Sequence, residues 1–125
     1  MTRARETGQI LRFGAVGGVA TATHLAIVAL LAGWTALAPA LVHAGGYAGA
    51  FLVSFFGHYH VTFRSRRAYA VALRKFMVVS LAVFLASVGI VWAAVAAGLA
   101  EAAALLLAAM SVPVLSYVLN RAYVY

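Results

Sequence analysis

The stretch KFMVVSLAVFLASVGIVWAAVAAG, residues 75–98, carries a single charged side chain, at its first position. A helix needs about 20 mostly apolar residues to cross the hydrocarbon core of a membrane. This stretch is long enough, and it contains no proline that would interrupt a helix. It therefore predicts a transmembrane helix.

Three further apolar stretches of similar length are present, and they cover residues 10–33, 39–62 and 101–121. The connections between the first and second spans and between the third and fourth are short, which predicts two tight helical hairpins. Pro39 suits the first turn of a helix, where a missing N–H costs nothing. Pro113 lies inside the fourth span and is expected to kink it.

The composition supports the same class of protein. Of the 125 residues, 66% are hydrophobic and 9% are charged, whereas a soluble domain has about 45–50% apolar and about 25% charged residues. Such a chain cannot cover itself with a water-compatible surface. The predicted fold class is an all-α integral membrane protein with four transmembrane helices. No cysteine is present, so disulfides are excluded.

The nine basic residues gather in three regions: the N-terminal segment, the middle loop and the C-terminal end. They are Arg3, Arg5, Arg12, Arg64, Arg66, Arg67, Arg74, Lys75 and Arg121. Neither predicted hairpin tip carries one. Because cytoplasmic segments are enriched in Lys and Arg, this asymmetry predicts that both termini and the middle loop are cytoplasmic. The net charge of +7 is therefore a signal of topology, and no nucleic-acid partner is expected.

The two halves of the chain share a weak pattern, which predicts a single domain built from two repeats, residues 10–63 and 74–125. Arg12-Phe13 recurs as Lys75-Phe76, 63 positions later, and the ending that starts at Ser54 recurs at Ser116, 62 positions later. Further pairs in the two endings are Phe55 with Tyr117, His58 with Asn120, Tyr59 with Arg121, and Phe63 with Tyr125. Each half holds two spans, so both enter the membrane in the same orientation, as a parallel repeat.

From about Leu11 to Tyr125 the chain resembles the GtrA-like family. The resemblance rests on the basic-aromatic start LRFGAVGG, the two hairpins, the basic middle loop and the ending SYVLNRAYVY. The first ending, SFFGHYHVTF, departs from the family pattern, since His58 and Tyr59 stand where Asn and Arg are usual.

The resemblance implies a role in the synthesis or modification of cell-surface polysaccharide at the bacterial inner membrane. The expected activity is translocation, or flipping, of a polyprenyl-phosphate-linked sugar, with membrane lipids and a second copy of the chain as further expected partners. The alternative is a scaffold that does not transport and that recruits a polyprenyl-phosphate glycosyltransferase, for which the middle loop RSRRAYAVALRK, residues 64–75, is the candidate docking segment.

Polar and cationic side chains near the cytoplasmic ends of the spans are candidates for binding the lipid phosphate or sugar, because arginine binds phosphate oxygens bidentately. The candidates are Arg12, Ser54, His58, Arg74, Lys75, Ser116, Asn120 and Arg121. Together they would form a cationic pocket. Snorkelling and interfacial anchoring are the plainer interpretation of each cation taken singly.

Three side chains deeper in the spans, His24, His43 and Tyr47, are candidates for lining a translocation path. Ionisable groups inside membranes usually face protein or water, and a neutral histidine hydrogen-bonded between helices is the plainer alternative. Tyr47 also begins an aromatic series at spacing four, which continues through Phe51, Phe55 and Tyr59 and suggests one stripe on the helix.

Other functions are disfavoured by the residues present. Glu6 and Glu101 are the only acids, so no carboxylate pair is available for catalysis, and an enzyme and a cofactor are not expected. His58 and His60 point to nearly opposite sides of a helix, so no metal site is predicted. A small multidrug exporter would need a glutamate within the first span. Gly14 with Gly18, and Gly45 with Gly49, are GxxxG pairs expected to pack the first two helices together or to form a dimer contact.

The predicted topology is testable with reporters fused to the C-terminus. A cytoplasmically active reporter, such as a fluorescent protein, is expected to be active there, and a reporter that works only outside the cytoplasm is expected to be silent. The same two reporters placed at residue 36, in the first hairpin tip, are the control and should give the reverse result. Activity of the external reporter at Tyr125 would contradict the topology.

Overall fold

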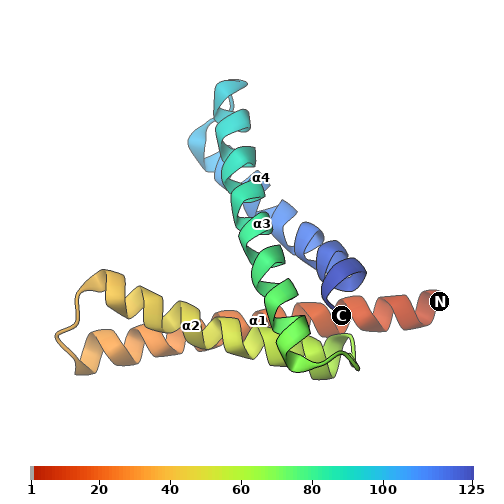
Figure 1. The fold of residues 1–125 in the computed structure, drawn as a ribbon. Helices are drawn as coiled ribbons and strands as arrows, with labels where there is room; N and C mark the ends of the chain where they lie inside the picture. Colours follow the sequence, from red (N-terminus) through yellow and green to blue (C-terminus); the bar gives the residue numbers. More distant parts are fainter. Residues whose placement is uncertain (1) are drawn as a thin grey trace. The chain divides into compact units, whose positions relative to one another are not determined.

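The computed structural model describes residues 2–125, which form four long helices and, within that range, no strand (Figure 1). The elements are α1 (Arg3–Trp34), α2 (Pro39–Gly57), η1 (His58–Thr62), α3 (Tyr69–Ala96), α4 (Glu101–Leu119) and η2 (Asn120–Val124). Each of the four helices is long and apolar enough to cross a membrane when the π-helical turns η1 and η2 are counted with α2 and α4. The predicted all-helical class with four long apolar helices is confirmed for the described residues, and it is compatible with four membrane spans.

Two helix starts differ from the prediction. Residue 10 was the expected start of the first span and residue 75 that of the third, whereas α1 begins at Arg3 and α3 at Tyr69. Apolarity marks only the part of a helix inside hydrocarbon, while Arg, Glu, Gln and Ala extend a helix well into the polar interface. Pro39 is the first residue of α2, as predicted. Helix α4 continues through Pro113 without a break in the assigned helix.

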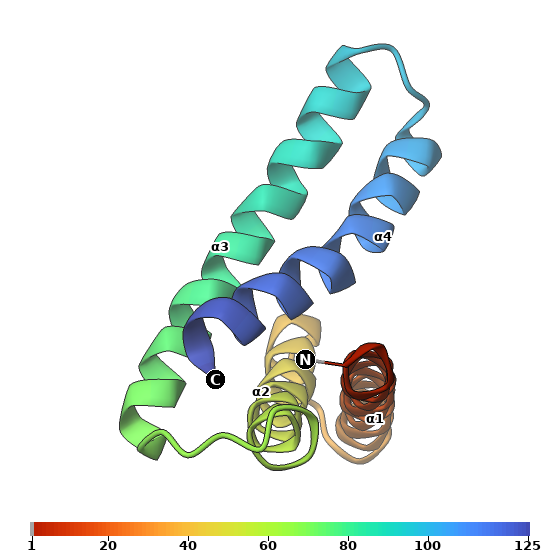
Figure 2. The ribbon, with the colours of Figure 1, turned by 90° about the vertical axis from the view of Figure 1, so that its right-hand side faces the viewer.

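The chain forms two compact units, which divide between Ser65 and Arg66. In unit 1, α1 and α2 lie side by side, and in unit 2, α3 and α4 do (Figures 1 and 2). Each pair is joined by a short turn, residues 35–38 in unit 1 and 97–100 in unit 2.

Glycines of α2 set the closeness of the two helices in unit 1. A Cβ atom added at Gly46 would lie 2.7 Å from Val28 Cγ2 and 3.0 Å from the backbone oxygen of His24, and one at Gly57 would lie 2.6 Å from Val16 Cγ1. These approaches leave no room for a side chain, so small residues allow the backbones to meet, as is usual between membrane helices.

The two predicted GxxxG pairs differ in their surroundings. A Cβ added at Gly45 or Gly49 would clash with Leu31 or Ile27 of α1, whereas Gly14 and Gly18 have open space at the Cβ position. Gly45 and Gly49 therefore pack α2 against α1, as expected. Gly14 and Gly18 do not take part in that packing, because they lie on another face of α1.

The positions of buried residues recur between the units at the spacings seen in the sequence. Val16 and Ala20 of α1 are buried, and so are Val79 and Val83 of α3, 63 positions later. The later elements match at 62 positions, and the buried pairs there are Val42 with Ala104, Gly46 with Ala108, His58 with Asn120, and Thr62 with Val124. The change from 63 to 62 means that one residue fewer separates the matched positions of α3 and α4 than those of α1 and α2. Both turns have four residues, so the difference lies in α3, which ends one residue earlier than α1 relative to the matched positions.

The short second turn is closed by a Schellman motif. Gly98 has φ 95°, its N–H donates to the Val95 oxygen, and the N–H of Leu99 donates to the Ala94 oxygen. Glycine suits this left-handed position because it has no Cβ atom. The motif directs the chain from the end of α3 into α4.

Substitution of Gly46 by leucine is expected to lower the free energy of unfolding by about 1–3 kcal/mol, because the side chain would overpack the contact with Val28 and His24. Unfolding of the purified protein in mixed micelles, followed by circular dichroism, measures the change. Gly89→Leu is the matched control, since Gly89 has open space at its Cβ position. Equal losses in the two variants would contradict the assigned α1–α2 contact.

Candidate functional site

A basic cleft with a volume of about 680 Å³ lies in unit 1, where the first turns of α1 meet the segment after η1. Its lining includes three arginines, Arg5, Arg12 and Arg64, and no acid. The remaining lining residues are Ala4, Gly8, Gln9 and Phe63. A cleft with this lining is suited to an anion.

The early start of α1 creates one wall of the cleft. Arg5, Gly8 and Arg12 are separated by three and four positions, so they share one face of the helix. Gly8 leaves the space between the two arginines unfilled, and a Cβ there would lie 3.5 Å from the Arg12 guanidinium. The prediction included Arg12 but not Arg5, because the span was expected to begin at residue 10.

The other wall depends on how η1 ends. The N–H of Phe63 donates to the His58 oxygen over 2.9 Å, and the N–H of Ser65 donates to the Tyr59 oxygen over 2.8 Å. Between them Arg64 has φ 50°, in the left-handed region that few residues other than glycine adopt. This reversal of the chain allows the Arg64 side chain to line the cleft beside α1. Sequence patterns carry no signal for such a turn.

Arg12 links the cleft to the interior of unit 1. It is half-buried, and one terminal nitrogen donates to the backbone oxygen of Thr62 over 3.5 Å. Its Nε is fully buried and has no hydrogen-bond partner among residues 2–125. A buried guanidinium N–H is costly to leave unpaired.

Below the cleft, His58 packs in the interior of unit 1. It is 3% exposed, its ring stacks on Phe13 with centroids 4.4 Å apart, and its Nδ1 lies 3.0 Å from the Thr62 hydroxyl. One face of the imidazole ring is therefore occupied by Phe13, and its Nδ1 atom is occupied by Thr62. Ser54, one helical turn earlier, is half-buried.

Unit 2 carries a counterpart cluster around η2. Asn120 is 1% exposed, and its Nδ2 donates to the Ser116 backbone oxygen over 2.7 Å and to the Ser116 hydroxyl over 3.1 Å. Its Oδ1 is buried and has no partner among the described residues. In unit 1 Thr62 supplies a hydroxyl one turn after His58, but the equivalent residue in unit 2 is Val124, which cannot donate.

Two cations of unit 2, Lys75 and Arg121, contact tyrosine side chains. Lys75 Nζ lies 4.5 Å from the centre of the Tyr123 ring, a cation–π geometry. Arg121 donates to the Tyr117 hydroxyl over 3.5 Å. Arg74 is exposed.

The predicted binding residues thus fall into two sets. Unit 1 holds Arg12, Ser54 and His58, and unit 2 holds Arg74, Lys75, Ser116, Asn120 and Arg121. Within each unit the polar residues gather at the end away from the short turn. The single pocket expected from all eight stays a prediction.

Of the three candidates for a translocation path, His24 and His43 are in contact in the structure. The rings of His24 in α1 and His43 in α2 lie 5.1 Å apart in an edge-to-face arrangement. His24 is half-buried, while His43 and Tyr47 are exposed and lie one turn apart on α2.

The aromatic series on α2 does not form the single stripe that its spacing suggested. Tyr47 is 56% exposed, whereas Phe55 and Tyr59 are buried. A spacing of four residues advances by about 40° per step around a helix of 3.6 residues per turn, so the series rotates from one face to another.

Residues 2–125 contain no group of three or more histidines, cysteines or acids that would hold a metal ion. The two clusters offer hydrogen-bond donors and positive charge.

Comparison with known proteins gives one family. The family model described as "GtrA/DPMS, transmembrane domain" matches residues 12–125. Neither the curated proteins nor the solved structures contain a match to the chain.

The two buried polar clusters are expected to differ in their response to apolar substitution. Thr62→Val leaves the buried His58 nitrogen without its partner and should destabilise the protein by about 1–3 kcal/mol. Asn120→Leu removes an oxygen that is already unpaired, which offsets the loss of the two bonds that Nδ2 donates to Ser116, so stability should be nearly unchanged. Unfolding in mixed micelles measures both variants side by side. A larger loss for Asn120→Leu than for Thr62→Val would contradict the unpaired state of Asn120 Oδ1.

Proposed function

The chain belongs to the GtrA/DPMS transmembrane-domain family, and on that basis we propose that it flips a polyprenyl-phosphate-linked sugar across the bacterial inner membrane. The family places it among the multi-pass membrane proteins of glycosylation pathways, in agreement with the resemblance seen in the sequence. The observation that carries the finer proposal is the three-arginine cleft of unit 1.

A lipid-linked sugar presents its phosphate at the level of the membrane interface, between an apolar chain and a polar sugar. The arginine cleft matches this level, because Arg5 and Arg12 lie in the first turns of a helix whose later residues are apolar. The planar fork of arginine binds phosphate oxygens with two parallel hydrogen bonds.

The charge distribution supports an orientation for this site. Under the positive-inside rule the arginine cleft faces the cytoplasm, where polyprenyl-phosphate sugars are made. The proposed architecture is two tandem hairpins in parallel repeat, with both termini cytoplasmic. The matching burial positions of the two units support the repeat.

The His24–His43 pair is the proposed polar step along the path. It lies 12 residues beyond Arg12 on α1, which is about 18 Å along the helix. A helix pair is too small to enclose a sugar, so His43 and Tyr47, which are exposed on α2, would line a groove open to a second copy of the chain or to lipid. No catalytic step is assigned to the chain.

The alternative is a scaffold for a polyprenyl-phosphate glycosyltransferase. The middle segment favours it, since Arg66 and Arg67 belong to neither the cleft nor a helix. Basic juxtamembrane segments attract acidic protein surfaces and anionic lipid.

Transport of a fluorescent or radiolabelled polyprenyl-phosphate sugar in liposomes that hold only this purified protein tests the proposal. The native protein should transport, and Arg12→Gln should reduce the rate by about tenfold or more, because charge-assisted hydrogen bonds to phosphate are lost. Asn120→Leu and Arg121→Ala should also reduce transport, with circular dichroism showing that each variant is folded.

The matched control is Arg66→Gln,Arg67→Gln, which removes the same kind of charge outside the cleft. It should transport at the native rate. If the native protein does not transport, and if the loop variant rather than Arg12→Gln loses co-purification with a glycosyltransferase, the scaffold replaces the flippase.

A further inference from the structure

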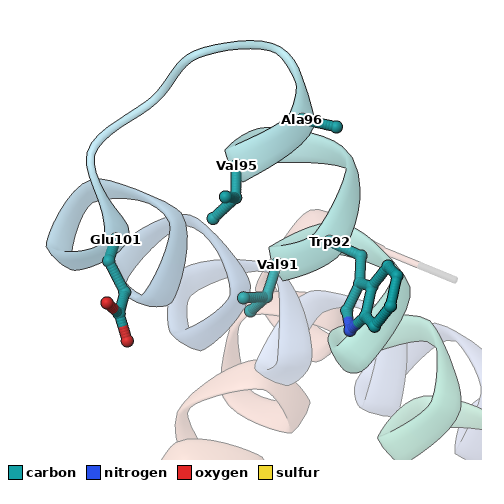
Figure 3. Close-up of a pocket in the computed structure, with 5 residues that line it drawn as sticks. All are labelled: Val91, Trp92, Val95, Ala96 and Glu101. Atoms are coloured by element: carbon teal, nitrogen blue, oxygen red, sulfur yellow. The ribbon is translucent and has the colours of Figure 1, made fainter.

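Unit 2 has a second hollow, with a volume of about 470 Å³, beside the short turn between α3 and α4 (Figure 3). It is lined by Val91, Trp92, Val95, Ala96 and Glu101. Sites for small molecules have volumes of about 300–1,000 Å³ and combine an apolar lining with a few polar groups. This hollow, the Trp92–Glu101 groove, fits that description.

The side chains of the groove divide into an apolar side and one acceptor. In Figure 3 the side chains of Val91 and Val95 point from α3 toward Glu101 at the start of α4. The Trp92 ring lies on the other side of Val91. Trp92 is 77% exposed. No hydrogen bond or ion pair of the Glu101 carboxylate occurs within residues 2–125, so its oxygens are available to a ligand.

The tryptophan and the carboxylate of the groove have no counterparts at the matching positions of unit 1. At the spacings that relate the two units, Trp92 corresponds to Ala29 and Glu101 to Pro39. The ring and the carboxylate are both missing there, although the helix pair is otherwise equivalent. Trp34 is also strongly exposed, at the end of α1. The groove is thus a local feature of unit 2 and not a consequence of the repeat.

We propose that the Trp92–Glu101 groove binds the sugar ring of the lipid-linked substrate, which is an inference that rests on the proposed function. A pyranose has an apolar C–H face and a rim of hydroxyls. The negatively charged face of an indole ring attracts polarised C–H groups, and a carboxylate accepts charge-assisted hydrogen bonds from hydroxyls.

The position of the groove defines its stage in transport. Glu101 begins α4 and Arg121 lies 20 residues later, about 30 Å along the helix. Under the predicted topology the groove is on the external face. It therefore holds the sugar after crossing, while the cleft of unit 1 receives the phosphate before crossing.

The test measures the fluorescence of Trp92 in nanodiscs, where both faces of the membrane are accessible. In a Trp34→Phe protein, Trp92 is the only tryptophan, because the chain has two. Titration with methyl glucopyranoside, methyl mannopyranoside and methyl arabinopyranoside should give a saturable change with at least one of them. Glu101→Gln should weaken that sugar's affinity by about tenfold, since the charge of the acceptor is lost.

Two matched controls separate the groove from general effects. Glu6→Gln removes the other carboxylate of the chain and should leave the affinity unchanged. A Trp92→Phe protein, which keeps Trp34, should show no saturable change. Equal responses of the two tryptophans, or an affinity unaffected by Glu101→Gln, would overturn the proposal. So would saturation by tetramethylammonium but by none of the sugars, because that result indicates a cation site.

The same variants distinguish failure of the groove from failure of the flippase. Saturable sugar binding without transport by the native protein would support the sugar-binding groove and contradict the flippase function. If Glu101→Gln transports at the native rate and no sugar binds at Trp92, the result would support the flippase function and contradict the sugar-binding groove.

Discussion

Backbone hydrogen bonding in hydrocarbon is the constraint on which this structure depends. A peptide group that meets neither water nor a partner there costs several kcal/mol, so a spanning segment satisfies its own bonds as a helix. The chain keeps to this rule to the ends of its spans. At the ends of α2 and α4 the backbone hydrogen bonds continue in a π-helical turn. The backbone N–H of Phe63 donates to the His58 oxygen in η1, and that of Tyr125 donates to the Asn120 oxygen in η2. Polar side chains gather at these turns, where such irregular helix is often functional.

Close helix packing and divergence of the two halves give the protein its chemistry. Glycines of α2 bring it against α1, which places η1 beside the first turns of α1 and completes the arginine cleft. Unit 2 has Ala68 and Ala72 where unit 1 has Arg5 and Gln9, and it has a tryptophan and a carboxylate at its turn instead. A common scaffold of two helix pairs therefore carries a cleft lined by three arginines in one half and an exposed tryptophan with a carboxylate in the other.

The candidate site was predictable in part. Arg12 and Asn120 were identified because a polar residue stands out at the end of an apolar run. Arg5 was missed because hydropathy placed the start of the helix too late, and Arg64 because its left-handed backbone has no sequence signal. His58 matched a repeat position, but only the structure shows that its ring packs on Phe13 and that Thr62 is its partner. Glu101 was seen as an isolated acid, without the valines and the tryptophan beside it.

The sequence by itself determined the membrane class, the four spans, the clustering of the basic residues and the 63- and 62-residue spacings of the two halves. These properties follow from hydropathy and periodicity, which are local and act along one helix at a time. The tertiary structure decided which face of each helix meets its neighbour: Gly45 and Gly49 pack whereas Gly14 and Gly18 do not, and Phe55 is buried whereas Tyr47 is exposed. In a uniformly apolar helix every face is equally hydrophobic, so only the fit of side chains between two helices selects the face that packs.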